Sequence, residues 1–181
     1  MNKFVLSVLG CDRPGIVAKV SGILTDHDCN IEDLTQTVLQ TEFAAIFIFS
    51  IPPGVQDNLY KCLKTELEPD GLSVRLKRMD TDCVFLPVSD PFVAVAIGPD
   101  HKGQIAALTR GISQYGCNIT SIKAINRSDL YPEKIVIIIE MDVPSKIVIS
   151  EMRLELERAA RQLGLQLSLQ HQDIFESIHR I

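Results

Sequence analysis

Hydrophobic residues in the first half of the chain change their spacing in a fixed order. Apolar positions run on or alternate where a strand is expected, and recur every three or four residues where a helix is expected. Pro52-Pro53-Gly54 interrupts the pattern midway. The predicted elements are a strand over 3–9, a helix from Gly15 to about His27, a hairpin of Asn30–Leu39 and Phe43–Ile51, a helix over Val55–Leu67 and a strand over Leu72–Met79.

The second half of the chain repeats this order of elements. Ile135–Ile139 is a continuous β-branched run, which is typical of a central strand buried on both faces. Ser145 is the expected N-cap of the last long helix, and Gly164 its C′ residue. The predicted elements are a strand over Phe92–Gly98, a helix over Gly103–Tyr115, strands over Asn118–Arg127 and Lys134–Asp142, a helix from Ser145 to Leu163 and a strand over Leu165–Leu169.

The two halves also share individual residues at a constant separation. Gly10 and Gly98 lie 88 positions apart, and the other matched pairs have the same offset without a gap. The matched residues are Phe4-Val5, Gly10, Asp12, Gly15, Ala18 and Cys29-Asn30-Ile31, against Phe92-Val93, Gly98, Asp100, Gly103, Ala106 and Cys117-Asn118-Ile119. A repeat of this length is the size of a small domain, so the chain is predicted to hold two copies of one module.

The order of elements predicts an α+β protein made of two ferredoxin-like βαββαβ modules, each an antiparallel sheet with two helices on one face. We expect domain 1 at 1–80, a linker at 81–90, domain 2 at 91–172 and a tail at 173–181. In the linker, Val84-Phe85-Leu86 is expected to dock on a neighbouring surface. The tail places Ile174, Phe175, Ile178 and Ile181 on one helical face, which packs on its own domain or binds a partner.

Composition narrows the functional classes. A net charge of −5 and a pI near 5.3 argue against a dedicated nucleic-acid surface. The first residues do not form a signal peptide, and no apolar run is long enough to span a membrane. The five cysteines lack C-x-x-C spacing, which favours reduced thiols and a cytoplasmic location. The four histidines show no zinc-binding spacing, so neither a metal nor a cofactor is expected.

Candidate chemistry lies in the turn after the first strand, Gly10-Cys11-Asp12-Arg13-Pro14-Gly15-Ile16. Pro14 is expected at the start of a helix, whose free N–H groups and dipole can receive a carboxylate. Asp12 can accept from an ammonium group, so the loop suits a free α-amino acid. The simpler alternative is that Asp12 caps the helix and Gly15 relieves crowding. Asn30 has a simpler explanation too, as a left-handed turn residue before its strand.

These residues resemble a known family. GCDRPGIV, CNIED and EFAAIFIFS look like an ACT domain, and GPDHKGQIAALTRGISQYGCNI is a diverged second copy. The whole chain resembles tandem-ACT regulators of the glycine cleavage system transcriptional repressor type. The resemblance implies amino-acid sites at interfaces between modules. The implied ligand-binding residues are Gly10, Cys11, Asp12, Arg13, Pro14, Gly15, Ile16, Asn30 and Ile31, with Gly98, Asp100, Gly103, Gln104, Asn118 and Ile119 in the second copy.

The second copy departs from the family pattern. His101-Lys102 replaces Arg-Pro, and Gln104 replaces the usual aliphatic residue, so this site is expected to be inactive or to take another ligand. We expect a non-catalytic homodimer that binds a small amino acid, glycine or serine first, and that controls a partner such as a transcription factor without touching DNA. The main alternative is a protein-interaction module without ligand. An enzyme using Cys11, or an RNA binder using Phe47 and Phe49, is a weaker alternative.

Overall fold

The computed structural model describes residues 2–52, 54–79, 87–126 and 133–179, and divides the chain into two compact units, Met1–Cys83 and Val84–Ile181. The expected linker core Val84-Phe85-Leu86 lies outside the described residues, as do residues 127–132, at the end of the predicted strand Asn118–Arg127 and after it. Each unit is described by itself below.

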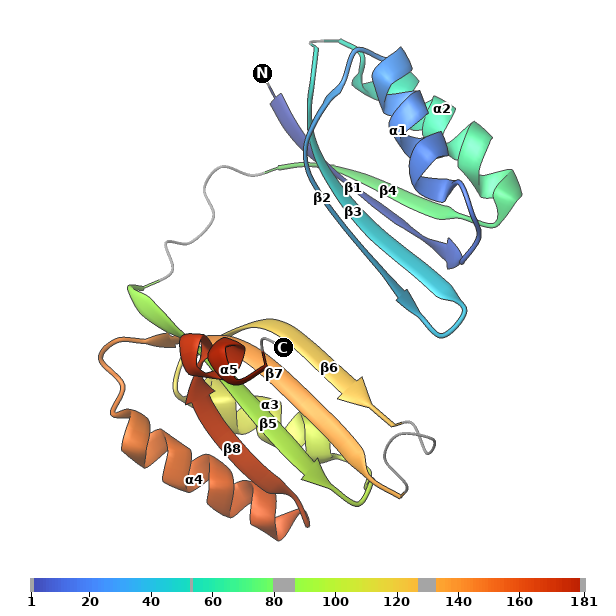
Figure 1. Cartoon of the computed structure of the whole chain (residues 1–181). Helices are drawn as coiled ribbons and strands as arrows, with labels where there is room; N and C mark the ends of the chain where they lie inside the picture. The colour runs from blue at the N-terminus through green and yellow to red at the C-terminus, as the bar shows by residue number, and fades with distance from the viewer. Residues whose placement is uncertain (1, 53, 80–86, 127–132, 180–181) are drawn as a thin grey trace. The chain divides into compact units, whose positions relative to one another are not determined.

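The first unit is one βαββαβ module (Figure 1). Its antiparallel sheet has the strand order β2-β3-β1-β4, and both helices cover one face of it. The elements are β1 (Asn2–Cys11), α1 (Ile16–Asp26), β2 (Asn30–Leu39), β3 (Glu42–Ile51), α2 (Gln56–Leu67), the short 3-10 helix η1 (Glu68–Asp70) and β4 (Ser73–Arg78).

The second unit repeats the topology with the strand order β6-β7-β5-β8. It adds a C-terminal helix, α5, which lies beside β5 and β8. The elements are β5 (Ser89–Gly98), α3 (Gln104–Gln114), β6 (Asn118–Ile125), β7 (Ile135–Pro144), α4 (Ile149–Gln162), β8 (Gln166–His171) and α5 (Gln172–His179). The predicted fold class, with two ferredoxin-like modules in tandem, is therefore confirmed.

Each module has its own hydrophobic core between the helices and the sheet. In the first module Phe47 and Phe49 are fully buried, and the Phe49 ring stacks against Phe4 with 6.4 Å between centroids. The RNA-binding alternative needs exposed aromatic rings on these strands, so burial of both rings removes its basis. In the second module, β7 is a central strand with Ile135, Ile137 and Ile139 buried, as its sequence predicts.

One predicted helix start is wrong. α4 begins at Ile149 with Val148 as N-cap, and no side chain caps it. Ser145 lies instead in the turn after β7, where its backbone N–H and its hydroxyl both donate to the carbonyl oxygen of Val88, at 3.0 and 3.2 Å. Ser145 therefore makes a tertiary contact beside the start of β5, and does not cap the helix as the local sequence predicts.

The end of α4 matches its prediction. Gly164 has φ 73° and follows the C-cap Leu163. The N–H of Leu165 donates to the Ala160 carbonyl at 2.9 Å and that of Gly164 to the Arg161 carbonyl at 3.1 Å, which is the Schellman pattern. This turn directs the chain into β8.

Gly10 marks a close approach of two main-chain segments. A Cβ added at Gly10 would lie 2.6 Å from the carbonyl oxygen of Gly71 and 2.9 Å from Cδ2 of Leu72. Gly98 meets Gly164 and Leu165 in the same way in the second module. Only glycine allows the first strand to end directly against the turn that begins the last strand.

We predict that Gly10→Ala destabilises the chain by about 1–3 kcal/mol, because the methyl group would force backbone apart in a packed region. The matched control is Gly22→Ala in the interior of α1, where a Cβ would meet nothing within 4 Å. Gly22→Ala should stabilise by about 0.5–1 kcal/mol, since alanine favours the helix. Urea unfolding followed by circular dichroism measures both, and equal effects would contradict the steric argument.

Candidate functional site

The candidate site of the first module is the loop from β1 to α1. The backbone N–H of Asp12 donates to the Thr41 carbonyl at 2.8 Å, which ties the loop to the turn of the β2–β3 hairpin. Gly15 is the N-cap of α1, with φ 92°, and no side chain caps this helix. Its first-turn N–H groups therefore have no side-chain acceptor from the cap, and the helix dipole adds positive potential there.

Neither simpler explanation of this loop agrees with the structure. Asp12 does not cap α1, and its side chain is exposed. A Cβ on Gly15 would meet nothing within 4 Å, so the glycine is required by its positive φ and not by crowding. Pro14 also differs from its expected place, because it lies one residue before the N-cap and not at the first helical position.

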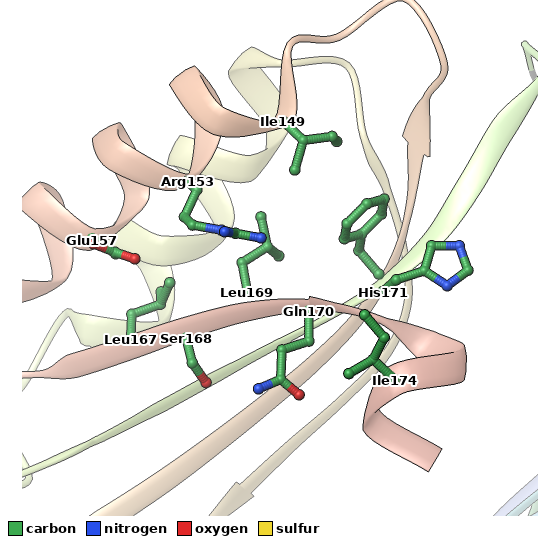
Figure 2. Close-up of a pocket in the computed structure, with 10 residues that line it drawn as sticks. Ile149, Arg153, Glu157, Leu167, Ser168, Leu169, Gln170, His171 and Ile174 are labelled. Atoms are coloured by element: carbon green, nitrogen blue, oxygen red, sulfur yellow. The ribbon is translucent and has the colours of Figure 1, made fainter. Parts of the chain in front are cut away.

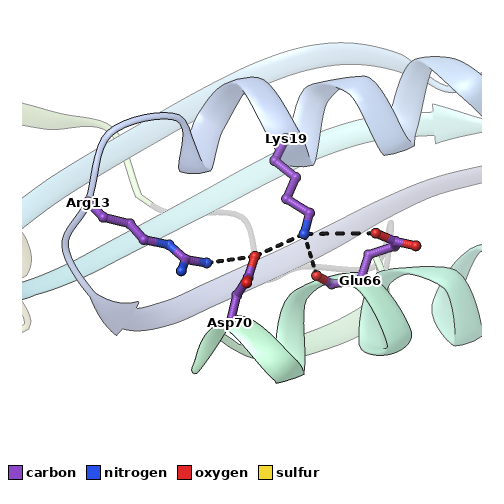
Figure 3. A network of polar contacts seen from close by, with 4 residues as sticks. All are labelled: Arg13, Lys19, Glu66 and Asp70. Atoms are coloured by element: carbon purple, nitrogen blue, oxygen red, sulfur yellow. Dashed lines mark hydrogen bonds and ion pairs between the residues drawn. The ribbon is translucent and has the colours of Figure 1, made fainter.

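Charged side chains connect this loop to the end of the second helix (Figure 3). Asp70 accepts from Arg13 at 2.7 Å and from Lys19 at 2.9 Å. The ammonium group of Lys19 also donates to the Glu66 carbonyl at 2.6 Å and lies 3.8 Å from its carboxylate. The sequence did not single out Lys19, Glu66 or Asp70, since helical residues 47 to 51 positions away carry no local signal of this contact.

These ion pairs position the side chain of Arg13, but they add little to the free energy of folding. The hydrogen bond from Lys19 lowers the pKa of Asp70, helped by the charge of Arg13. This stabilisation is therefore present above the ordinary carboxyl pKa and is lost as the pH falls through the lowered one. Because the side chains are one-third or more exposed, the ion pairs contribute little free energy. They do fix Arg13 at the rim of a shallow hollow of about 250 Å³ that also includes Gly15 and Ile16.

Asn30 and Ile31 lie at the other end of the sheet. Asn30 is the first residue of β2 and pairs with Ser50, which pairs with Lys3 near the start of β1. Nine residues of extended chain separate that level from Asp12, roughly 30 Å. Asn30 is not the left-handed turn residue, because Asp28 has that conformation, with φ 54°. Ile31 packs against the core. One module alone therefore cannot bring Asp12 and Asn30 to a single small ligand.

The corresponding loop of the second module is occupied by its own side chains. Gln104 is 1% exposed, and its amide nitrogen donates to the carbonyls of Pro99 and Leu163 at 2.8 and 3.0 Å. Its amide oxygen accepts from the N–H of His101 at 3.1 Å. The Asp100 carboxylate accepts from Asn126 at 2.6 Å. The polar groups expected to face a ligand here are already hydrogen-bonded within the protein.

The remaining predicted residues of the second module repeat the first. Gly103 is the N-cap of α3, with φ 89°. Asn118 begins β6 at the level of Asp142, which pairs with Pro91, so it also lies at the end of the sheet opposite the loop. Ile119 packs against the core. The turn before β6 has Gly116 in the left-handed conformation, with φ 70°.

The thiols differ in their surroundings. Burial raises the pKa of the Cys29 thiol and, at the equivalent position, that of Cys117. A raised pKa keeps these sulfurs protonated, which suits packing and not nucleophilic attack. Cys11 is exposed at the end of β1. In the part of the chain that the structure describes, no three His, Cys, Asp or Glu side chains are placed to hold a metal ion, and no helix is long and apolar enough to cross a membrane.

A second hollow lies beside the edge strand β8, and no motif of the sequence indicates it. Figure 2 shows Arg153 of α4 reaching over Leu169, with Ile149 and Ile174 at its sides. The hollow has a volume of about 540 Å³, and His171 forms one end of it. The rings of His171 and Phe92 pack edge to face, with 5.3 Å between their centroids. It is an open surface groove with an apolar floor.

Comparison with known proteins agrees with this architecture. The ferredoxin-like βαββαβ module defines the class, and the model of the ACT domain matches residues 2–77 and again 90–170. The chain belongs to the ACT-domain family, with two such domains in tandem.

Some similar proteins match about two fifths of this chain, and some similar structures match nearly all of it. A UPF0237 protein of Methanopyrus kandleri is 47% identical over 71 residues, 39% of this chain and 77% of that protein. One from Pyrobaculum aerophilum is 44% identical over the same shares. A protein of unknown function from Galdieria sulphuraria has a TM-score of 0.78 at 23% identity, covering 94% of this chain and 98% of that one. A candidate glycine cleavage system transcriptional repressor has a TM-score of 0.71 at 23% identity, covering 93% and 96%.

We predict that Gln104→Ile destabilises the chain by about 1–3 kcal/mol, because it leaves the His101 N–H and two carbonyls of the second module without their buried partner. Isoleucine is the residue at the equivalent position, Ile16, so the shape is tolerated by the fold. Ile105→Ala is the control on the same helix, since Ile105 is 40% exposed, and should change stability by about 0.5 kcal/mol or less. Urea midpoints that fall equally in both variants would contradict a specific role for the amide.

Proposed function

We propose that this chain is a non-catalytic regulatory protein that binds a small amino acid, glycine or serine, through the β1–α1 loop of its first module. The observation that carries the proposal is the pairing of uncapped α1 N–H groups with the exposed carboxylate of Asp12 on one loop. The N–H groups suit the ligand's carboxylate, and Asp12 suits its ammonium group. Membership of the ACT-domain family supports a regulatory role.

The opposite positions of Asp12 and Asn30 define what a complete site needs. Since one module holds these residues at opposite ends of its sheet, a site that uses both takes the loop from one module and Asn30 from another. A ligand bound between modules stabilises the arrangement in which they meet, in proportion to its preference for that arrangement. This gives the bound amino acid a means to change the affinity for a partner.

The partner in this proposal is a regulatory protein such as a transcription factor, and the setting is the cytoplasm. A structure of similar fold is a candidate glycine cleavage system transcriptional repressor, which favours control of amino-acid metabolism. The acidic balance of the chain agrees with an action through protein contacts and not through DNA.

A second candidate function is a protein-interaction module without a ligand. The second module favours it, because Gln104 and Asp100 are both hydrogen-bonded within the protein. If the first loop has the same role, the two copies are rigid scaffolds whose surfaces carry the function.

Isothermal titration of the full chain with glycine, and then with serine, separates the two functions. We expect saturable heat with the unmodified chain, none with Asp12→Ala, and an unchanged isotherm with Asp100→Ala, whose carboxylate is held by Asn126. Binding should also raise the melting temperature at millimolar ligand. No heat and no shift for any amino acid would support the interaction module. Binding that survives Asp12→Ala would place the site elsewhere.

A further inference from the structure

The sheet of the first module has one face without helices, and the middle of that face is apolar. Side chains on each strand alternate, so those that do not point toward α1 and α2 form cross-strand rows on the open face. Leu9 is 53% exposed and Ile46 45% exposed there, although both lie on the two central strands. From β2 to β4 the three central rows are Asp33–Ile48–Val5–Lys77, Thr35–Ile46–Ser7–Arg75 and Thr37–Ala44–Leu9–Ser73.

The equivalent sheet face of the second module is less exposed near the start of β5. Val93, the counterpart of the half-buried Val5, is 2% exposed, and α5 lies beside β5 and β8 in this module. In Figure 1, α5 lies in front of the second sheet and α3 behind it. Among the residues of the first unit that the structure describes, no helix takes the place of α5. The repeated scaffold therefore leaves the open face of the first module with exposed apolar residues in a central position.

The three rows are complementary to themselves. A two-fold axis that runs parallel to the strands between β1 and β3 places each row over the same row of a second copy, with β1 over β3 and β2 over β4. Large residues then meet small ones: Leu9 faces Ala44 and Ile46 faces Ser7 of the other copy. A shallow hollow of about 310 Å³ lies over these small residues, lined also by Thr35 and Thr37. It provides space for the larger side chains.

Charge follows the same symmetry. On this face the β2 end of the first row has the carboxylate of Asp33, and the β4 end has the ammonium group of Lys77. The same rotation places Asp33 of one copy over Lys77 of the other, twice in the pair. The middle positions of all three rows have no charged residue. The rotation also places Arg75, at the β4 end of the second row, over the uncharged Thr35. Like charges therefore do not meet in these rows, and the first row supplies a pair of opposite charges on each side of an uncharged centre, as a self-complementary interface requires.

The size of the face sets the expected strength. Four strands spaced about 4.8 Å apart, up to ten residues long, present roughly 500 Å² on each copy. The pair would bury about 1,000 Å², which is the smallest size expected of a biological interface and is typical of weak ones. Two sheets packed face to face in this way keep their strands within about 30° of each other.

We propose that the open sheet face of the first module is an interface with a second copy of this chain, packed face to face about a two-fold axis parallel to the strands. It gives a location to the dimer expected from the sequence, and it does not use the amino acid. If glycine and serine do not bind, this inference is unaffected. If the chain does not dimerise through this face, the result of the amino-acid titration is also unaffected.

Sedimentation equilibrium of the full chain tests the interface. We expect a mainly dimeric chain at roughly 100 μM, which requires a dissociation constant of about 10 μM or tighter. Ile46→Lys should weaken association at least tenfold, because it buries an unpaired charge at the centre. Ile97→Lys is the matched control, on the open face of the second module at 39% exposure, and should leave the dimer unchanged. Circular dichroism verifies that both variants are folded.

A charge exchange tests the orientation. Asp33→Lys and Lys77→Asp should each weaken the dimer by placing like charges opposite each other, and the double variant should restore it. A wild-type chain that remains monomeric at roughly 100 μM would overturn the proposal. So would an Ile46→Lys variant that remains a dimer, or a double variant that is no better than the single ones.

Discussion

Each module depends on one place where two stretches of main chain approach too closely for any side chain. In the first module, Gly10 near the end of β1 lies against the carbonyl of Gly71. In the second module, β5 ends at Gly98 against the carbonyl of Gly164. This contact fixes the start of the β–α loop beside the turn that follows the second helix. In the first module this places the loop where Arg13 reaches Asp70 after the second helix.

The two modules secure that loop by different chemistry on the same scaffold. The first uses partly exposed charges, Arg13 and Lys19 on Asp70. The second uses one buried amide, Gln104, which binds the carbonyl of Leu163 at the corresponding turn. An exposed ion pair can exchange partners at little cost in free energy, whereas a buried amide with three hydrogen bonds cannot. The contacts of the first loop are therefore more easily exchanged than those of the second.

The same division extends to the surfaces. Repetition preserved the buried cores, the sheet order and the left-handed glycine that precedes the first helix of each module, Gly15 and Gly103. It did not preserve the outer faces, where Ile46 is exposed on one sheet and α5 lies beside the other. One stable fold therefore carries two differently secured loops and two different outer sheet faces.

The sequence by itself determined the repeat, the order of elements and the fold class, because these depend on apolar periodicity and on glycines that a local turn requires, such as Gly15 and Gly164. It also located the loop that carries the candidate chemistry. Tertiary structure alone decided the rest. Ser145 does not cap the predicted helix, because it hydrogen-bonds to Val88. Gln104 is buried with all its polar groups bonded, because the carbonyl of Leu163 lies beside it in the folded module. Asp12 and Asn30, 18 positions apart in the chain, were separated to opposite ends of one sheet by strand register. Such contacts depend on pairings between distant residues, and no local pattern of residues encodes them.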